Sequence, residues 1–249
     1  MIRGLYIAAT GMVDQMARMD TISNNLANVN TAAFKKDYNV TRSFPEILMD
    51  RQGYTDASLK KPDIGTINYG VWSGGIYTDL SQGSFQKTDN PLDLAIDGNG
   101  FFAVQSGNRV LYTRDGRFTR GSNGLLVTTE GMPVLGVNGV INLPQGQVTV
   151  NPNGDIYVNG NYVDTLRLVD INGGNGGAIT KFGDNLITGP IGNRPVGGIR
   201  QGYVEASNVN PIEEMVDMIE VTRAYEANQK VITAMDDTLN KAVNEVGRI

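Results

Sequence analysis

The chain has 249 residues, which is enough for one large domain or two small ones with a substantial core. It carries 21 basic and 26 acidic residues, a net charge of −5, so nucleic acid and anionic membranes are not expected partners. It contains no Cys and no His, which excludes disulfides, thiol nucleophiles, zinc sites with nitrogen or sulfur ligands, and imidazole-dependent triads. No apolar run reaches the length of about 18 residues that a membrane span needs. We therefore expect no cofactor, no metal site and no membrane span.

The first segment predicts an amphipathic helix over about residues 3–28. Apolar positions recur at heptad spacing in two series, as they do in coiled coils. The first series is Leu5, Met12, Met19 and Leu26, and the second is Ile2, Ala9, Met16 and Ser23. The opening "MIRGLYIAATGM" is a poor secretory signal because its apolar run is short and mixed. If the protein is exported, we expect its N-terminus to stay in place.

An Asn-rich segment, "TISNNLANVNTAAFKK" at residues 21–36, follows directly on this helix. Asn side chains bond nearby backbone groups, so such a run lets the chain turn sharply at a helix end and offers donors and acceptors to other molecules. We take Asn24, Asn25, Asn28 and Asn30 as candidate contact residues. A solvated helix end without a partner is the alternative.

The middle of the chain is β in character. Of 31 glycines, all but Gly4, Gly11, Gly202 and Gly247 lie within residues 53–198. Short β-prone runs such as "RVLYTRDGRFTR" are separated by Asn-Gly pairs at 123–124, 138–139 and 153–154, which favour antiparallel hairpins in a sandwich or open barrel. Residues 37–80 are weakly patterned, and we expect an extended connector that packs against another part.

The C-terminal segment predicts a long helix of about 35 residues. Asn210 suits the N-cap, Pro211 the first helical position, and Glu213 a capping box. Apolar positions again recur at heptad spacing: Met218, Tyr225, Ile232, Leu239 and Val246 form one series, and Val221, Asn228, Met235, Ala242 and Ile249 the other. A polar Asn at such a core position fixes register or partner at some cost in stability.

These elements predict an α+β fold. The long N- and C-terminal helices pair as a coiled-coil-like inner domain, and the middle of the chain forms a central antiparallel β domain. We place the boundaries at 1–36, 37–80, 81–200 and 201–249. Met-rich helical faces repack easily against different neighbours. We therefore expect an assembly interface, although a purely intramolecular helix pair is the simpler alternative. The expected interface residues are Leu5, Met12, Met16, Met19, Leu26, Asn24, Asn25, Asn28, Asn30, Met218, Val221, Tyr225, Asn228, Ile232, Met235 and Leu239.

Carboxylates are the acid–base groups available for catalysis. Asp93, Asp97, Asp115 and Glu130 lie in or near the β region, and a glycosidase would need two of them at a set separation. Asp in "RDGR" or "IDGNG" is far more often a turn residue that bonds the local backbone. The "DGNG" stretch does not match a calcium loop, because Asn108 stands where the bidentate Glu is required.

Five stretches in order resemble the bacterial flagellar basal-body rod proteins: "MIRGLYIAATGM", "ISNNLANVNT…FKK", "IDGNGFFAVQ", "YTRDGRF" and "QGYVEASNVNPIEEMVDMIEVTRAYEANQKVI". The resemblance implies a structural subunit and no enzyme, exported by the flagellar type III apparatus without cleavage. It implies stacking into the helical tube of the rod, which crosses the periplasm or cell wall and transmits torque to the hook. The implied partners are this chain itself or other rod proteins, with hook-side and ring components.

Two details of the resemblance concern position and subtype. The family usually has Gly before the aromatic residue of the Asn-rich signature, and this chain has Ala33 before Phe34. If that position needs a positive φ, Ala costs about 1 kcal/mol, so we expect the backbone to differ or the turn to be shifted there. The chain ending "MDDTLNKAVNEVGRI" is similar to an FlgF-like proximal-rod type, and we favour this type over an FlgG-like distal one.

Two other classes of function remain open on the sequence. One is a carbohydrate-active β enzyme with helical flanks, and the other is an adhesin-like binding module. For the rod subunit, we expect assembly to be coupled to folding, because the terminal helices of a single subunit leave apolar positions for other copies to cover.

Overall fold

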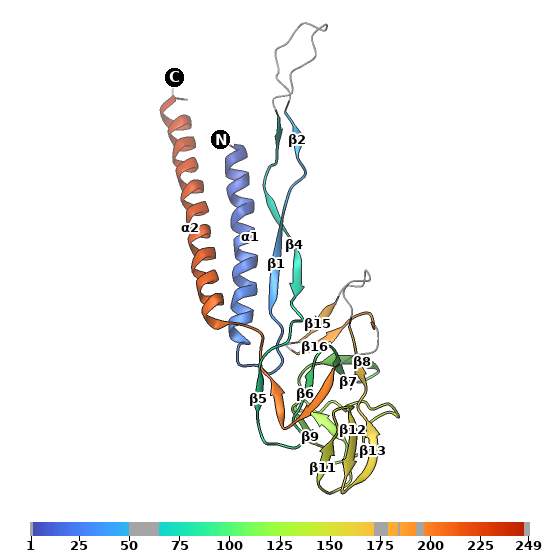
Figure 1. Ribbon diagram of the computed structural model, residues 1–249. Coiled ribbons are helices and arrows are strands. Elements are labelled where there is room, and N and C mark those ends of the chain that lie inside the picture. Colours follow the sequence, from blue (N-terminus) through green and yellow to red (C-terminus); the bar gives the residue numbers. More distant parts are fainter. Residues whose placement is uncertain (1, 50–64, 172–178, 184, 193–196, 247–249) are drawn as a thin grey trace, which may run out of the picture. The chain divides into compact units, whose positions relative to one another are not determined.

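The computed structural model describes residues 2–49, 65–171, 179–183, 185–192 and 197–246 (Figure 1). The chain divides into two compact units, each built from segments that are distant in the sequence. The helical unit comprises Met1–Leu26, Asp37–Tyr77 and Pro211–Ile249, and the β unit comprises Ala27–Lys36 and Thr78–Asn210. Helices and antiparallel strands occupy separate parts of the chain, so the predicted α+β class is confirmed.

The helical unit holds both terminal helices, α1 (Ile2–Ala27) and α2 (Pro211–Lys241). Helix α2 continues into a π-helical turn, η2 (Ala242–Val246), and the predicted seam residue Ile249 lies outside the described residues. Pro211 opens α2 at a position where the missing N–H is of little consequence, since the first amides of a helix have no intrahelical acceptor. The predicted starts and ends of these helices are confirmed to within the usual uncertainty of helix ends. None of the described helices is long and apolar enough to cross a membrane.

The described parts of residues 37–77, which are 37–49 and 65–77, form a two-stranded ribbon within the helical unit. Strand β1 (Asp37–Ser43) pairs with β4 (Val71–Thr78), and β2 (Ile47–Leu48) pairs antiparallel with β3 (Thr66–Ile67). The ribbon contacts α1, because the Thr41 hydroxyl donates to the Asp14 carboxylate at 2.8 Å and the Tyr6 and Phe44 rings stack 6.5 Å apart. The segment expected to be a connector is thus a ribbon packed on the N-terminal helix.

The β unit contains several small antiparallel sheets. The largest has the order β14-β7-β8-β16-β15 and a second has the order β11-β12-β13. Three further pairs are β9 with β10, β6 with β17 and β5 with β18. The bounds are β5 (Phe85–Lys87), β6 (Leu94–Asp97), β7 (Phe101–Ser106), β8 (Arg109–Thr113), β9 (Phe118–Arg120), β10 (Leu126–Thr128), β11 (Val148–Val150), β12 (Asp155–Val158), β13 (Asn161–Thr165), β14 (Leu168–Val169), β15 (Thr180–Phe182), β16 (Leu186–Thr188), β17 (Gly198–Gln201) and β18 (Tyr203–Glu205).

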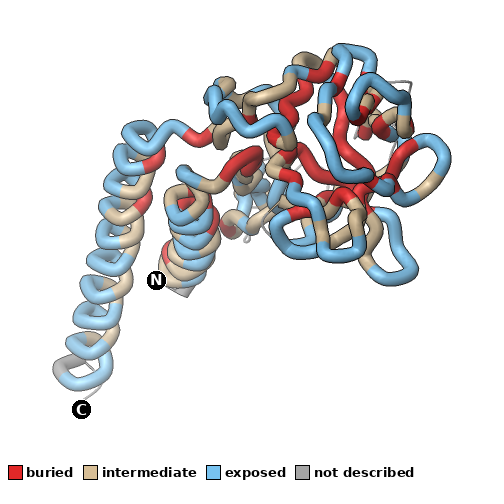
Figure 2. The backbone as a smooth tube through the Cα atoms, turned by 90° about the horizontal axis from the view of Figure 1, so that it is seen from below, coloured by how far each residue is buried: buried red, intermediate tan, exposed pale blue. Residues whose placement is uncertain are grey.

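Strand β7 organises the core of the β unit because both of its faces are buried. Phe102 and Val104 belong to one apolar cluster, in which the Phe102 and Phe118 rings meet edge to face at 5.1 Å. Phe101 and Ala103 point to a second cluster on the other face. Figure 2 shows the buried strands of this unit in red, whereas the terminal helices are mostly tan and pale blue. The β unit therefore has its own core, and the helices leave much apolar surface uncovered.

Candidate assembly interface

Helices α1 and α2 run antiparallel (Figure 1). Side chains of α2 reach α1 at three levels along the two helices. Gly4 lies under the end of Met235, where a Cβ would clash. A Cβ on Gly11 would lie 3.1 Å from the Asn228 amide nitrogen. Farther along, Asn25 donates to Glu214. From one level to the next, the contact moves forward along α1 by the same number of residues as it moves back along α2. One antiparallel register therefore accounts for all three levels.

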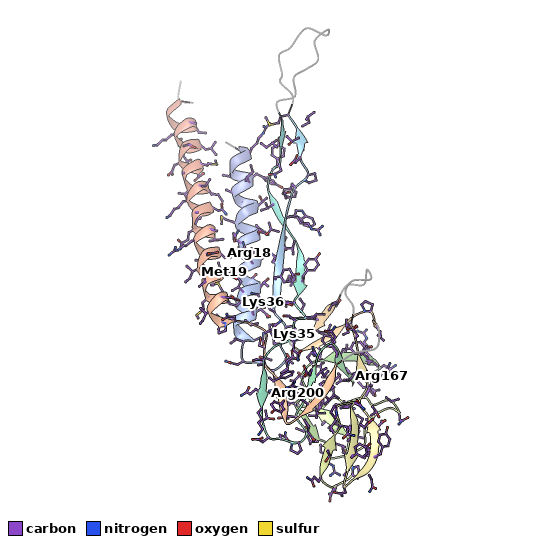
Figure 3. The ribbon with its side chains drawn as sticks, in the orientation of Figure 1. Arg18, Met19, Lys35, Lys36, Arg167 and Arg200 are labelled. Atoms are coloured by element: carbon purple, nitrogen blue, oxygen red, sulfur yellow. The ribbon has the colours of Figure 1, made fainter. Side chains whose placement is uncertain are left out.

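The predicted heptad residues lie beside this line of contact. On α1, Leu5, Met12 and Leu26 each follow a residue of the contact line, and these three residues and Met19 are half-buried. Met16 is 51% exposed, and Met19 projects from the helix in Figure 3. On α2, Val221 is buried, and half-buried are Met218, Tyr225, Asn228, Ile232, Met235 and Leu239. The predicted series on α2 is thus the less exposed side of that helix.

Both helices also carry a second apolar stripe that is exposed in the single chain. On α2 it comprises Ile212, Met215, Val216 and Ile219, which are 48–68% exposed. On α1 it comprises Tyr6, Val13 and Met16, which are 51–68% exposed. Except for Met16, the sequence analysis missed these residues, although the heptad spacing from Tyr6 to Val13 and from Ile212 to Ile219 was a usable signal. Contiguous apolar surface of this kind is typical of protein–protein contacts.

Asn25 joins three segments of the helical unit. Its amide nitrogen donates to the Asp37 carbonyl at 2.8 Å and to the Glu214 carboxylate at 3.0 Å, and its amide oxygen accepts from the Asp37 N–H at 3.0 Å. Asn25 and Glu214 are each 1% exposed. This one side chain therefore ties the end of α1 to the start of the ribbon and the start of α2.

The other three Asn residues of the signature have different surroundings. Asn24 and Asn30 are exposed, and Asn28 is half-buried with its side-chain oxygen accepting from the Thr31 hydroxyl at 3.0 Å. The structure thus does not bring the four predicted Asn side chains into one cluster. It uses Asn25 inside the chain and Asn28 in a local turn.

The signature continues into the β unit, where Ala33 has a φ of +57°. The expectation that the backbone would differ or the turn would shift at this residue is wrong, because the left-handed conformation is present with Ala in place. Its N–H donates to the Glu205 carbonyl at 2.8 Å, and the next amide, that of Phe34, donates to the Thr31 carbonyl at 3.3 Å. Such surrounding bonds hold a residue in a conformation that is unfavourable by itself.

Lys35 belongs to a buried charge cluster with Glu205 and Arg114 in the β unit. The Lys35 ammonium lies 2.5 Å from one Glu205 oxygen and donates to the Ser81 carbonyl at 2.7 Å. The Arg114 guanidinium lies 3.6 Å from the other Glu205 oxygen and donates to the Gly98 carbonyl at 2.7 Å. Burial lowers the pKa of both Lys35 and Arg114, and Glu205 opposes that effect. Sequence analysis missed this cluster because its members are far apart in the chain.

Asn208 closes the same region from the C-terminal side. Its side-chain oxygen accepts from the Lys36 N–H at 2.7 Å, and its amide donates to the carbonyls of Asp79 and Ser81 at 3.0 and 3.2 Å. Asn208, which precedes α2, therefore bonds both to Lys36, which follows α1, and to the start of the Thr78–Asn210 segment of the β unit.

Three of the four predicted acid–base candidates have partners among nearby polar or basic side chains. Asp115 accepts from the backbone and guanidinium of Arg117, as a turn residue does. Asp97 pairs with Arg200, Asp93 accepts from the Asn90 amide at 3.0 Å, and Glu130 is exposed. The contacts of Asp93 and Asp115 favour the turn interpretation, and Asp97 forms an ion pair between the strands β6 and β17.

Three family models match successive parts of the chain. Residues 5–35 match the model described as flagella basal body rod protein, residues 95–158 the flagellar hook protein FlgE/F/G D1 domain, and residues 200–245 the flagellar basal body rod FlgEFG protein C-terminal. The matches include the signature, the central strands and most of α2. These three matches do not cover residues 36–94, which include the ribbon, or residues 159–199.

Curated relatives align along nearly the whole chain. The chain is 32% identical to the flagellar hook-basal body complex protein FlhO of Bacillus subtilis (strain 168), with all of both chains covered. It is 38% identical to the flagellar basal-body rod protein FlgG of Buchnera aphidicola subsp. Acyrthosiphon pisum (strain APS), covering 97% of this chain and 98% of the relative. It is 33% identical to FlgF of Caulobacter vibrioides, again with both chains covered completely. The chain therefore belongs to the flagellar basal-body rod FlgE/F/G family.

Proposed function

We propose that this chain is a structural subunit of the flagellar basal-body rod and that it polymerises through its terminal helices. The observation that carries the proposal is the pair of exposed apolar stripes, one on α1 and one on α2. A single chain leaves this surface in water, whereas a neighbouring copy can bury it and gain about 25 cal/mol for each Å² removed. Members of this family are structural proteins of the flagellum, and the chain is not an enzyme.

In the assembled state the two helices act as a coiled-coil-like inner domain. The antiparallel register at Gly4, Gly11 and Asn25 supports this arrangement within one chain. Between copies, the interface combines the exposed stripes with the predicted set: Leu5, Met12, Met16, Met19, Leu26, Asn24, Asn25, Asn28, Asn30, Met218, Val221, Tyr225, Asn228, Ile232, Met235 and Leu239. Half-buried members such as Met12 can contact the other helix of the same chain and also a neighbouring copy.

The subunit is exported by the flagellar type III apparatus and joins the tube that crosses the periplasm or cell wall and transmits torque to the hook. Its partners are other copies, proximal and distal rod proteins, and hook-side and ring components, and we favour an FlgF-like proximal position. Family membership supports these statements at the level of the rod. The division at residues 36, 80 and 200 likewise stays a prediction.

The test compares two single charges on α2. Ile219→Asp places a carboxylate in the exposed stripe, and Gln229→Asp places one at an exposed polar position of the same helix. Two strains of the source bacterium are made, each with its natural gene replaced by one variant gene. Basal bodies are purified from each strain, and the amount of the subunit in them is measured. We expect Ile219→Asp to abolish incorporation and motility while purified monomer keeps its helical circular dichroism. Gln229→Asp should assemble normally. Normal incorporation of Ile219→Asp would contradict the proposed use of this stripe.

A further inference from the structure

The buried charge cluster of Lys35, Arg114 and Glu205 has unequal numbers of opposite charges. Its side chains are 2%, 4% and 0% exposed, so water screens them little. Two cations share one carboxylate, and no described contact brings Arg114 a second acidic partner. Its remaining described bonds go to the backbone carbonyls of Gly98 and Ile96, and its guanidinium lies over the Phe101 ring at 5.4 Å.

Glu205 is the member on which the cluster depends. One of its oxygens accepts from the Lys35 ammonium and also from the Gly83 N–H at 2.9 Å, and the other faces Arg114. Without this carboxylate, two buried cations would face each other, and backbone dipoles and the Asp79 carboxylate near Lys35 would be their remaining compensation. Removing one partner of a buried ion pair is strongly destabilising because the remaining charge stays buried and uncompensated.

The three residues enter the fold from different parts of the chain. Lys35 belongs to the N-terminal signature, Arg114 follows the central strand β8, and Glu205 ends β18 just before α2. Backbone amides of the signature also depend on residues near the start of α2. The Ala33 N–H donates to the Glu205 carbonyl, and the Lys36 N–H donates to the side-chain oxygen of Asn208. The signature is thus held largely by residues that are translated about 170 positions later.

We propose that Glu205 gates the docking of the N-terminal signature into the β unit. Until β18 pairs with β5 and delivers its carboxylate, Lys35 stays in water and the signature remains undocked, even when the strands around Arg114 have formed. A chain that has not yet supplied its C-terminal segment therefore cannot fix the residues that follow α1. The gate is a property of folding of the single chain and does not depend on assembly into the rod.

The first test is pulse-labelling hydrogen exchange during refolding of the full chain. We expect the amides of Ala33 and Lys36 to gain protection in the same phase as those of β18, and later than those of β7 and β8. Protection of the signature amides in the earlier phase, together with β7 and β8, would overturn the proposal.

The second test measures native-state exchange in charge variants of the full chain. Glu205→Gln keeps the shape but removes the counterion, and we expect exchange at Ala33 and Lys36 to accelerate about 100-fold while β7 and β8 remain protected. Asp97→Asn is the matched control, because it breaks an exposed pair with Arg200 in the same unit and should change these rates by less than about threefold.

A double variant separates charge from packing. Lys35→Met in the Glu205→Gln background leaves one buried cation instead of two, so at least tenfold of the lost protection should return. The comparison remains decisive if Glu205→Gln does not fold, because the double variant should then fold. Equal loss in the single and double variants would show that the hydrogen bonds of Glu205, and not its charge, hold the signature, and the gate would be rejected.

Discussion

Ala33 adopts a left-handed backbone conformation at φ +57° although it carries a Cβ and is 3% exposed. For an L-residue this conformation costs about 1–2 kcal/mol, and the cost rises for β-branched side chains. The bond from its N–H to the Glu205 carbonyl fixes the conformation from outside the turn. The site thus keeps the geometry that Gly would adopt freely, at a steady cost in stability.

Two substitutions at Ala33 should have unequal effects. Ala33→Gly removes the strain but also a buried methyl group worth about 0.8 kcal/mol, and it raises the entropy of the unfolded chain, so the free energy of unfolding should change by less than about 1 kcal/mol. Ala33→Val adds a β-branched side chain in the same conformation and should destabilise by about 2–4 kcal/mol. Urea denaturation of both variants measures the difference. Equal stability of the Gly and Val variants would mean that the turn relaxes to a negative φ.

The stability contributed by Lys35 should depend on pH. Burial holds the pKa of Lys35 below its ordinary value of 10.5, and Glu205 offsets only part of this effect. Between the folded pKa and 10.5, the unfolded chain binds more protons than the folded chain. The unfolding free energy should therefore rise with pH in this window, and the contribution is lost as the pH falls through the folded pKa. Lys35→Met should remove this dependence.

The measurement for Lys35 is a series of urea unfolding curves for both proteins between neutral pH and pH 10.5. Other titrating groups are shared, so they cancel in the difference between wild type and variant. The difference should shift in favour of wild type as the pH rises. A constant difference, or one that shifts toward the variant, would contradict the depressed pKa.

At the scale of elements, the helical unit depends on Asn25, where α1, β1 and α2 meet. Replacing Asn25 by Ala leaves the Asp37 backbone groups and the Glu214 carboxylate without their shared partner in a buried place. Unsatisfied buried polar groups cost about 1–3 kcal/mol, and charged ones more, so we expect a loss of about 2–3 kcal/mol. Thermal and urea unfolding followed by far-ultraviolet circular dichroism would measure it.

Ser23→Ala is the control for Asn25→Ala. Ser23 is an exposed residue of the same helix turn, and its replacement should change stability by less than about 0.5 kcal/mol. Ala favours the helix more than Asn or Ser does, so helix propensity cannot account for a loss in either variant. Similar losses in both variants would therefore contradict a special contribution of the Asn25 junction.

The elements also differ in how far the sequence predicted them. The terminal helices were predictable because heptads, Pro211 and the acidic first turn of α2 are local signals. The Asn-Gly turns were predictable for the same reason, and Gly124, Gly139 and Gly154 all have positive φ values. The ribbon strands β1 and β4 were missed because they lack a regular alternation of buried and exposed residues. The two strands are defined by their packing against α1, and no local sequence pattern indicates that packing.

The candidate site was predictable in part. The heptad pattern located the less exposed side of α2, but it did not show that the contact line on α1 runs through Gly4 and Gly11. Small residues permit close approach and are invisible to a search for apolar positions. The charge cluster was beyond local reasoning, since Lys35 and Glu205 are 170 positions apart.

For the whole molecule, the uneven burial of the two units predicts uneven resistance to proteolysis. The helices carry exposed trypsin sites at Arg18, Arg223, Lys230 and Lys241, and their apolar stripes lack cover in the single chain. Opening of such elements is expected to be easier than opening of the β core. Limited trypsin digestion of purified monomer should therefore cleave both helices first and leave a stable β fragment.

Assembled rods provide the comparison for this digestion. In purified basal bodies the same helical sites should resist trypsin, because neighbouring copies bury the stripes. If the helices of the monomer survive trypsin as long as the β unit does, then folding and assembly are not coupled in the way proposed here.

The β unit is made of two segments that interrupt the helical unit, so the chain leaves the helical part and returns to it twice. In topological terms the β unit consists of two insertions, Ala27–Lys36 and Thr78–Asn210, between consecutive segments of the helical unit. Loops or whole strands can be gained or lost within it without moving a single residue of α1 or α2 along its own axis. The β unit of a related subunit can thus grow or shrink while the two terminal helices keep their lengths.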